Sequence, residues 1–296
     1  MQKTITKVAI VGGTHGNEIT GVHLVTTYQN NPHLVYRHSF ETLCLHANPK
    51  AIRQKTRYVD TDLNRCFTCK DLNDPNLQHH EAILAKELNR FLGPKGSEKP
   101  KVDFIVDLHT TTSNMGMSLC ISTKDALTWQ VAAYLQAHLP SLNIFYWEAP
   151  SYEPSFISTV AHGGFTVEVG PIAQNLLQAT TYQQTDTIVQ KILDFFELYN
   201  TQQLAQRFTE VTVYAYVDKI DFPRDATGTI TAMIHPDLQT SGYQKLSQGD
   251  PLFLTYEGKT IAYTKKTSLY TVFVNEAAYY EKGVAMQLCT KKTLKI

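Results

Sequence analysis

The chain has 296 residues, of which 43% are hydrophobic and 18% are charged, an ordinary composition for a soluble globular protein. Its 27 Lys and Arg residues equal its 27 Asp and Glu residues in number, so the formal net charge at pH 7 is zero. This balance disfavours nucleic acid or an anionic membrane as the main partner, and no apolar run approaches the roughly 18 residues of a membrane-spanning helix.

Strand-like and helix-like segments alternate over the first two-thirds of the chain. In order, the predicted elements are a strand over 8–11, a helix over 18–29, a strand over 40–46, a helix over 81–92, a strand over 102–108, a strand over 165–169 and a helix over 182–199. Gly12 and Gly13 indicate a turn after the first strand, and the polar stretch 50–78 predicts no regular element. The alternation predicts an α/β fold, in which helices cover both faces of one sheet.

After residues 200–203 the pattern changes. Residues 208–296 contain many short β-like runs, among them 211–214, 252–255 and 270–274, and glycines separate these runs. Because 296 residues exceed the usual length of one domain, we predict an α/β domain over residues 1–205 and a small, mostly-β domain over residues 206–296.

Cysteine usage and the N-terminus both indicate a cytoplasmic protein. The five cysteines are an odd number spread over a long chain, which is unlike a disulfide framework. No signal-peptide core precedes the first predicted strand. Cys66 and Cys69 form an isolated CxxC pair, for which a structural role is favoured over a redox or zinc role because no second pair accompanies it.

A candidate metal site combines two histidines with a glutamate. His15 and Glu18 stand three residues apart where the first strand gives way to a helix, so both side chains reach the same face of one helical turn. Catalytic zinc commonly has three protein ligands, and two histidines with one glutamate are a standard set. His109 follows the strand over 102–108, at the edge of the sheet where α/β proteins gather their sites, and would supply the third ligand.

An HxxE pair alone is a weak signal for a metal site. Asp107 faces the same side of its strand as His109, and it is either a carboxylate that supports this ligand or a solvated residue. Five other histidines are alternative candidates for the metal ligands, but isolated histidines more often lie on the surface or pack in the core. They are His23, His46, His79, His80 and His162.

Other polar residues suggest hydrolytic chemistry near this site. Glu168 lies in an apolar strand, where burying a carboxylate is costly unless it has a task such as acting as general base beside a metal ion. Alternatively, Glu168 lies on the solvated side of an edge strand and has no catalytic role. Arg57, Asn64 and Arg65 share one polar stretch, and arginine binds carboxylates in a bidentate fork or stabilises an oxyanion. A surface loop with salt bridges is the alternative for this stretch.

These motifs resemble those of the aspartoacylases, within the zinc carboxypeptidase-like superfamily, and the resemblance covers nearly the whole chain. It rests on the segments 12–18 (GGTHGNE), 56–58 (TRY), 62–65 (DLNR), 107–116 (DLHTTTSNMG), 167–171 (VEVGP), 222–225 (FPRD) and 274–282 (VNEAAYYEK). The HxxE pair and the strand-end histidine recur among carboxypeptidases, whereas the first and last of these segments are more specific to aspartoacylases. The resemblance implies a mixed sheet flanked by helices, followed by a mostly-β domain that roofs the active-site cleft.

Carried over by position, the resemblance implies a role for each residue of a catalytic zinc site. His15, Glu18 and His109 would bind one zinc ion per chain. Glu168 would act as general base and later as proton donor to the leaving amine. Arg57 would polarise the amide carbonyl and stabilise the developing oxyanion together with the zinc.

The resemblance also implies the substrate and its contacts. Asn64, Arg65 and Tyr279 would bind the α-carboxylate of the substrate, and Arg57 and Glu168 would contact the scissile amide. The partner would therefore be a small N-acyl amino acid rather than nucleic acid or a membrane. The relatives also suggest a homo-oligomer.

One position departs from the family pattern. Aspartoacylases that cleave N-acetylaspartate carry an arginine ten residues before the catalytic glutamate, where it pairs with the side-chain carboxylate of the substrate. Here that position holds Ser158, and Pro154 replaces a tyrosine expected four residues earlier. Residues 151–161 contain no Lys or Arg. Loss of a charge-assisted contact costs about 1.5–3 kcal/mol, or roughly ten- to a hundred-fold in discrimination.

Two explanations of this departure remain open. Another cation, such as His162 or a lysine of the second domain, would restore the contact with an aspartate side chain. Alternatively Tyr152, Phe156 and Ile157 would form a pocket for an apolar or aromatic side chain, as in an aminoacylase branch that acts on N-acyl aromatic amino acids.

The leading hypothesis is therefore a zinc-dependent amidohydrolase whose family-default substrate is N-acetyl-L-aspartate, giving acetate and aspartate. A deacylase of N-acyl aromatic or apolar amino acids is the alternative that Ser158 suggests. A carboxypeptidase is disfavoured by the additional β-domain with Tyr279. A non-catalytic zinc-binding interaction protein is disfavoured by the intact Glu168 and Arg57.

Overall fold

The fold is built on one ten-stranded sheet, and the computed structural model describes residues 4–147 and 153–296. The strands of this sheet, in chain order, are β1 (Lys7–Gly12), β2 (Glu41–His46), β3 (Phe104–Thr110), β4 (Gly116–Ile121), β5 (Leu142–Tyr146), β6 (Gly163–Gly170), β7 (Glu210–Ile220), β9 (Lys245–Leu246), β12 (Leu269–Val272) and β13 (Met286–Lys295). Their order across the sheet is β2-β1-β3-β6-β4-β5-β7-β13-β12-β9.

The sheet is mixed, as the predicted fold class requires. Strands β2, β1, β3 and β6 run parallel, β4 is antiparallel to β6, and β5 is parallel to both β4 and β7. Beyond β7 every pairing is antiparallel. The parallel part needs cover on both faces, because its strands are apolar on both sides.

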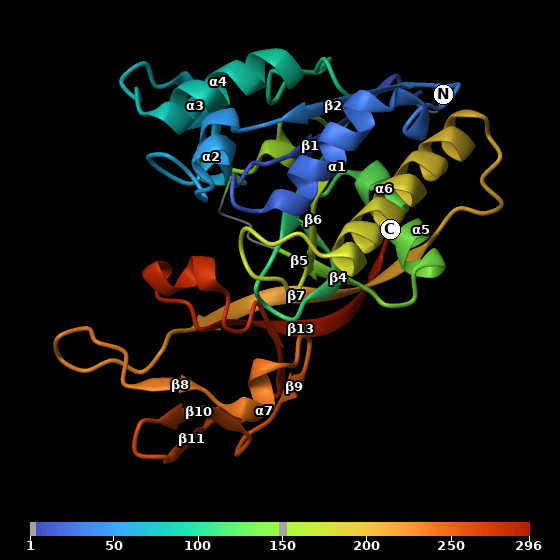
Figure 1. Ribbon diagram of the computed structural model, residues 1–296. Coiled ribbons are helices and arrows are strands. Elements are labelled where there is room, and N and C mark those ends of the chain that lie inside the picture. Colours follow the sequence, from blue (N-terminus) through green and yellow to red (C-terminus); the bar gives the residue numbers. More distant parts are fainter. Residues whose placement is uncertain (1–3, 148–152) are drawn as a thin grey trace.

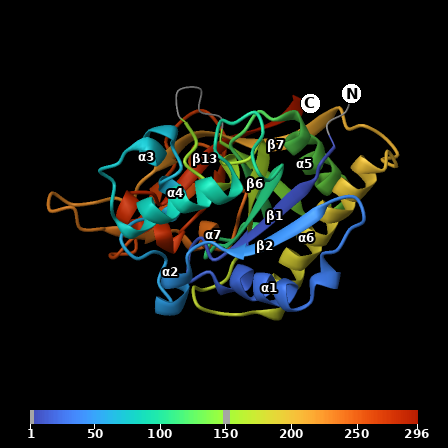
Figure 2. The ribbon, with the colours of Figure 1, turned by 90° about the horizontal axis from the view of Figure 1, so that it is seen from above.

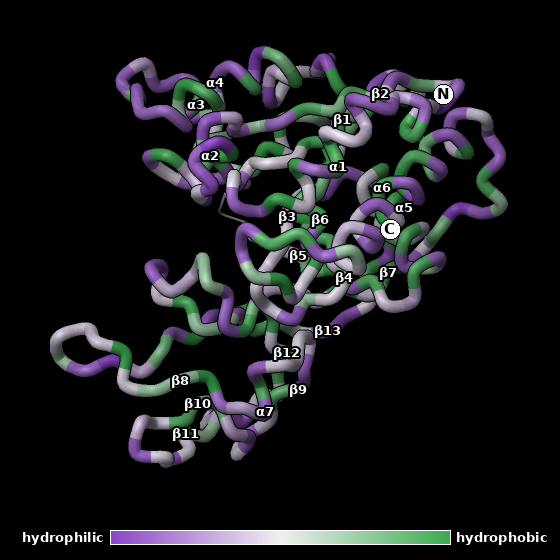
Figure 3. Tube along the Cα trace, viewed as in Figure 1, coloured by the Kyte–Doolittle hydropathy of each residue, from purple (hydrophilic) through white to green (hydrophobic). Residues whose placement is uncertain are grey.

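Helices provide this cover on the two faces, which confirms the predicted layering (Figures 1 and 2). The main helices are α1 (Ile19–Asn30), α4 (His80–Leu92), α5 (Ala126–His138) and α6 (Ala179–Asn200). Alternate residues of β1 enter different cores: Val8 and Ile10 pack with α1, α5 and α6, whereas Ala9 and Val11 pack with α4. Hydrophobic segments accordingly gather where the central strands β5 and β6 lie (Figure 3).

The stretch 50–78, for which the sequence predicts no regular element, contains only short helical segments. The short helices and 3₁₀ turns of the chain are η1 (Pro32–Leu34), α2 (Pro49–Gln54), η2 (Leu63–Arg65), α3 (Cys69–Asn73), η3 (Ile157–Thr159), α7 (Pro236–Gln239) and η4 (Ala277–Lys282). Side chains cap three of them within or next to this stretch: Asn48 caps α2, Asp62 caps η2 and Thr68 caps α3. Segments this short contain too few turns for helical periodicity to be recognised in the sequence.

The C-terminal part is mostly β, as predicted, and it continues the large sheet. Strand β7 pairs directly with β5, so the sheet runs without a break from the N-terminal part into residues 206–296. A smaller three-stranded sheet of β8 (Ala232–Ile234), β10 (Pro251–Thr255) and β11 (Thr260–Ala262) projects away from α1, α4, α5 and α6 (Figure 1). The division into 1–205 and 206–296 stays a prediction.

Among the described residues, no helix combines the length and the apolar character needed to cross a membrane.

Glycines allow α1 to lie very close to the sheet. A Cβ atom on Gly12 would lie 2.3 Å from the carbonyl oxygen of Gly21 in α1. Gly13 follows with φ +70°, and a Cβ there would lie 2.5 Å from Ile52. Since α1 begins directly after this turn, the close packing fixes where the turn residues point.

We expect Gly12→Ala to destabilise the protein, because two backbones would have to separate to admit the methyl group. Overpacking of this kind costs about 1–3 kcal/mol. Urea unfolding should give a lower free energy of unfolding for this variant than for His23→Ala, whose side chain lies on the exposed face of α1. Equal stability of the two variants would show that α1 can move away from β1 at no cost.

Candidate functional site

The carboxyl ends of β1, β3 and β6 meet at one edge of the sheet, and the predicted catalytic residues gather there. His15 and Glu18 lie in the turn between β1 and α1, with Glu18 immediately before the helix. His109 is the last but one residue of β3 and lies directly opposite Glu168 on β6. Parallel strands in register thus bring together side chains that are distant in sequence.

Three of these side chains form a cluster of potential metal ligands. His15 Nδ1 lies 2.7 Å from Glu18 Oε1, and His109 Nδ1 lies 2.8 Å from Glu18 Oε2 and 3.0 Å from His15 Nδ1. All three residues are buried. Within residues 4–147 and 153–296, this is the one group of His, Cys, Asp and Glu side chains with metal-ligand spacing.

A carboxylate supports each histidine from the side opposite the cluster. His15 Nε2 lies 3.0 Å from Asp62 Oδ1, and His109 Nε2 lies 2.7 Å from Asp107 Oδ2. An Nε2–H that donates to a carboxylate leaves the Nδ1 lone pair of each ring directed at the same place. Two facing lone pairs beside the Glu18 carboxylate fit a bound cation, and this donor set fits catalytic zinc.

The charges around the cluster also suit a cation. Burial favours the neutral form of Glu18, but the adjacent His15 and His109 rings hold its pKa well below its usual range. Burial would lower the pKa of His109, yet Asp107 and Glu18 raise it well above its usual value. The surrounding carboxylates therefore favour positive charge at this point.

Arg57 lies beside the cluster and is held by two acids. Its Nη1 donates to Glu18 Oε1 at 2.9 Å and its Nη2 donates to Asp62 Oδ2 at 3.2 Å. The loop that carries Arg57 and Asp62 is fixed by Glu81, whose carboxylate accepts hydrogen bonds from the backbone N–H groups of residues 59–61. The guanidinium is thus fixed next to the predicted metal position.

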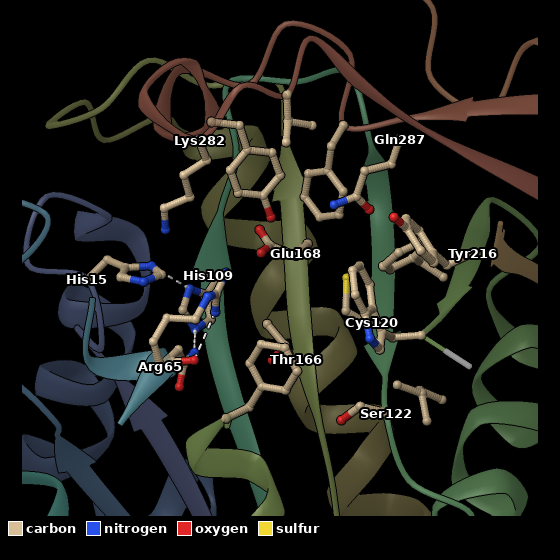
Figure 4. Close-up of a pocket in the computed structure, with 18 of the residues that line it drawn as sticks. His15, Arg65, His109, Cys120, Ser122, Thr166, Glu168, Tyr216, Lys282 and Gln287 are labelled. Atoms are coloured by element: carbon tan, nitrogen blue, oxygen red, sulfur yellow. Dashed lines mark hydrogen bonds between the residues drawn. The ribbon is translucent and has the colours of Figure 1, made fainter. Parts of the chain in front are cut away.

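Glu168 faces the centre of the site (Figure 4), and its Oε2 has no hydrogen-bond partner among the described residues. Burial raises the pKa of its carboxyl to about 8, an effect that His109 opposes and Glu18 strengthens. A bound dication would lower this pKa again. Burial and a bound cation thus shift the pKa of Glu168 in opposite directions, which suits a carboxyl group that accepts a proton and later donates it.

A cavity of about 340 Å³ lies in front of these groups. The predicted site residues that line it are His15, Arg57, Asn64, Arg65, His109, Glu168 and Tyr279. Glu18 lies beside it, in a small adjoining hollow that Arg57 and Glu168 share. The structure therefore brings all the predicted site residues together, while their individual roles stay predictions.

The two neighbouring residues predicted to bind the α-carboxylate differ in their contacts. Arg65 donates through Nη1 to the Asn64 carbonyl oxygen at 2.8 Å, and its guanidinium lies 5.4 Å from the centre of the Phe156 ring. Asn64 is buried, and its Nδ2 donates to Asp107 Oδ2 at 2.9 Å while its Oδ1 accepts from the Ile157 N–H at 2.9 Å. Arg65 thus has donors left for a carboxylate, whereas Asn64 also positions Asp107.

Tyr279 reaches the cavity from η4, which Glu276 anchors. Glu276 Oε2 accepts hydrogen bonds from the Thr112 N–H at 2.9 Å and from the Thr111 and Thr112 hydroxyls, and Oε1 accepts from the Ala278 N–H at 3.1 Å. The carboxylate thereby ties η4 to the loop after β3. Glu276 belongs to the 274–282 motif, but nothing in that motif predicts which loop its side chain contacts.

The cavity wall away from the cluster of potential metal ligands is largely aromatic, and no sequence pattern predicts it. Its residues come from β4, β5, β7 and β13 and from the segments that follow β5 and β12; they are Cys120, Phe145, Trp147, Tyr216, Phe273 and Gln287. Trp147 and Tyr216 stack with their ring centres 4.2 Å apart. Strand alternation indicates which residues share a face, but it does not show that β7 and β13 follow β5 in the sheet.

The segment in which the family pattern places its side-chain-binding arginine contributes little to the cavity. Of its described residues, Phe156 lines the cavity, whereas Ser158 is buried outside it and Ile157 packs in the core under α4. His162 is exposed and its Nε2 lies 2.9 Å from a backbone carbonyl oxygen. Tyr152 falls outside the described residues.

The competing histidines and the CxxC pair take no part in the cluster of metal ligands. His46 Nε2 lies 3.1 Å from the Val22 carbonyl oxygen, and His79 caps α4. Cys66 is buried and Cys69 is exposed, both as free thiols. Nothing in these contacts changes the structural interpretation of the pair.

Comparisons with known proteins agree with this geometry. Residues 4–196 match the succinylglutamate desuccinylase/aspartoacylase catalytic domain, and residues 209–291 match the AstE/AspA barrel-sandwich hybrid domain. A probable aspartoacylase of Trichodesmium erythraeum is 45% identical over 99% of this chain and 100% of that protein. The human N-acyl-aromatic-L-amino acid amidohydrolase (carboxylate-forming) is 38% identical over 100% of this chain and 93% of its own. Murine aminoacylase 3 has a crystal structure that matches with a TM-score of 0.92 and 34% identity, covering 100% of this chain and 98% of that one.

We expect Asp107→Asn to weaken zinc binding about 10- to 100-fold, because an amide holds the Nε2–H of His109 less strongly than a carboxylate does. Competition with a chromophoric chelator measures the zinc Kd directly. Asp237→Asn, which changes an exposed carboxylate in the same way, should leave the Kd unchanged. An unaltered Kd in Asp107→Asn would show that the carboxylate does not support the ligand.

Proposed function

Because the chain belongs to the succinylglutamate desuccinylase/aspartoacylase family, we propose that it is a zinc-dependent amidohydrolase of N-acyl-L-amino acids. It would release a carboxylate and a free amino acid. The observation that carries the proposal is the unpartnered Glu168 carboxylate, which faces the same cavity as His15, His109 and Arg57. Binding alone gives no reason to bury such a carboxylate without a partner.

The donor set of His15, Glu18 and His109 would hold the zinc ion, which when bound polarises the amide carbonyl and lowers the pKa of water. Glu168 accepts the proton of the attacking water on its carboxylate and later donates it to the nitrogen of the leaving amine. Arg57 directs its guanidinium toward the developing oxyanion, and its fixed position means that it need not reorganise during the reaction.

Arg65 is the residue best placed to bind the α-carboxylate. Its remaining N–H donors offer a planar fork, and the Phe156 ring supports the guanidinium from one face. Tyr279 reaches the same cavity from η4. By closing over the cleft, this turn would restrict the site to small substrates, which argues against a carboxypeptidase.

The side chain of the substrate is proposed to be aromatic or apolar rather than that of aspartate. Ser158 does not reach the cavity, so the position that carries an arginine in enzymes acting on N-acetylaspartate contributes no charge here. Lys282 does line the cavity, but its Nζ lies 3.3 Å from Asp62 Oδ2, which already partners it. Lys219 also lines the cavity, but it is exposed and therefore hydrated. Among the described residues, the aromatic wall thus offers a carboxylate no buried cation.

Side-by-side assays with zinc-loaded protein test this substrate class. We expect kcat/KM for N-acetyl-L-phenylalanine to exceed that for N-acetyl-L-aspartate at least tenfold. A carboxylate against the aromatic wall would lack a charge-assisted contact with a buried cation, which costs about 1.5–3 kcal/mol. Release of free amino acid is the measurement. A preference for N-acetyl-L-aspartate would favour the family-default substrate instead. If neither compound is hydrolysed, the proposed activity is wrong.

We expect Glu168→Gln to lower kcat by about 10²–10⁴-fold, the range typical of general acid–base groups, because the amide cannot accept a proton. Metal analysis should still find one zinc per chain, since Glu168 is not one of the three clustered ligands. The matched control is Glu87→Gln, an exposed change on α4 that should leave kcat unaltered. Full activity in Glu168→Gln would exclude it as the base.

A further inference from the structure

Gln287 places an unsatisfied amide in the aromatic part of the cavity. The residue lies on β13, is 8% exposed and lines the cavity. Its buried Oε1 has no hydrogen-bond partner among residues 4–147 and 153–296. Figure 4 shows its side chain pointing into the space between Glu168 and Tyr216.

A second unsatisfied polar group lies in the same wall. The Nε1–H of Trp147 is buried and likewise lacks a partner within the described part of the chain. A buried polar group left without a hydrogen bond costs about 1–3 kcal/mol, and such groups are rare in folded proteins. Two of them lining one cavity indicate that a ligand completes their hydrogen bonds.

The groups around Gln287 and Trp147 favour a flat ligand. Trp147 stacks on Tyr216 with an interplanar angle of 21°, and Phe145 contacts both Trp147 and Phe273 edge to face at 6.2 and 5.8 Å between ring centres. Aromatic walls of this kind bind another ring by offset stacking and edge contacts.

We propose that this part of the cavity binds an aromatic ring that bears a hydroxyl group, with the hydroxyl hydrogen-bonded to Gln287. This inference rests on the proposed function. A hydroxyl both donates and accepts, so it can donate to Gln287 Oε1 while it accepts from an N–H of the Gln287 amide or of Trp147. An unsubstituted phenyl ring would leave the buried Oε1 without a donor.

A carboxylate is a poorer match, although a cation is near. Lys219 lies directly opposite Gln287 in the β7–β13 pair and also lines the cavity, but it is exposed and therefore hydrated. A carboxylate accepts hydrogen bonds but donates none, so it would leave Gln287 Oε1 unsatisfied.

The hydroxyl-bearing ring could be the side chain of the amino acid, as in an N-acyl-tyrosine, or part of the acyl group. Two substrate pairs distinguish these sources: N-acetyl-L-tyrosine against N-acetyl-L-phenylalanine, and N-(4-hydroxybenzoyl)glycine against N-benzoylglycine. We expect the hydroxylated member to have at least tenfold higher kcat/KM in the first pair, since sites built to bind a hydroxyl discriminate strongly against its absence. The same preference in the second pair alone would assign the ring to the acyl group.

Gln287→Met keeps the length of the side chain but removes its hydrogen-bonding groups, and it should reduce the hydroxyl preference at least tenfold. Trp147→Phe, which keeps a ring and removes the N–H, should reduce it less. Lys259→Met, which changes an exposed lysine outside the cavity, is the control and should leave the ratio unchanged. Zinc content and the unfolding midpoint confirm that each variant is folded.

Equal kcat/KM values within both pairs, or a hydroxyl preference that survives Gln287→Met, would overturn the inference. A preference for N-acetyl-L-aspartate that is lost in Lys219→Met would overturn it in favour of a carboxylate. If no N-acyl amino acid is hydrolysed, the proposed function fails separately. In that case the Kd values of N-acetyl-L-tyrosine and N-acetyl-L-phenylalanine for the zinc-loaded protein, measured by calorimetry, test the inference independently of catalysis. A lower Kd for the tyrosine derivative would support it, and equal values would overturn it.

Discussion

The convergence of two imidazole nitrogens on one carboxylate is the constraint on which the rest of the structure depends. His15 Nδ1 and His109 Nδ1 lie 3.0 Å apart, and each lies within 2.8 Å of a Glu18 oxygen. Groups gathered this closely in a buried place need a positive charge or a shared proton between them, since two lone pairs and a carboxylate repel one another. The parallel pairing of β1 with β3 and the tight glycine turn before α1 bring these three groups to that point.

The carboxylate of Asp62 connects this constraint to the rest of the site. It lies 3.0 Å from His15 Nε2, accepts a hydrogen bond from Arg57 at 3.2 Å and lies 3.3 Å from Lys282 Nζ. A predicted metal ligand, the arginine next to it and the end of η4 therefore share one acid. Its pKa stays well below the usual range, because His15 and Arg57 outweigh the effect of burial. A change at any one of these partners alters the charge balance at the others.

The sequence predicted what depends on local pattern and could not predict what depends on distant pairing. Strand and helix periodicity located β1, α1, β3 and α6, and motif spacing identified His15, Glu18 and His109. Neither the anchoring of η4 by Glu276 nor the aromatic wall could be predicted, because both arise from contacts between segments that are far apart in the chain. No periodicity along the chain encodes that β7 pairs with β5.

The same distant pairing places the predicted catalytic residues and the aromatic wall on different strands. The metal cluster and Glu168 belong to β1, β3, β6 and the turn before α1, whereas Tyr216 and Gln287 project from β7 and β13 on the far side of β4 and β5. Side chains on these distant strands can differ in size or polarity without touching the clustered ligands. Relatives named for aspartate and for aromatic amino acids are both similar to this chain over nearly its full length. If the proposed roles hold, residues of the second set of strands could differ between such relatives while the clustered residues of the first set stay the same.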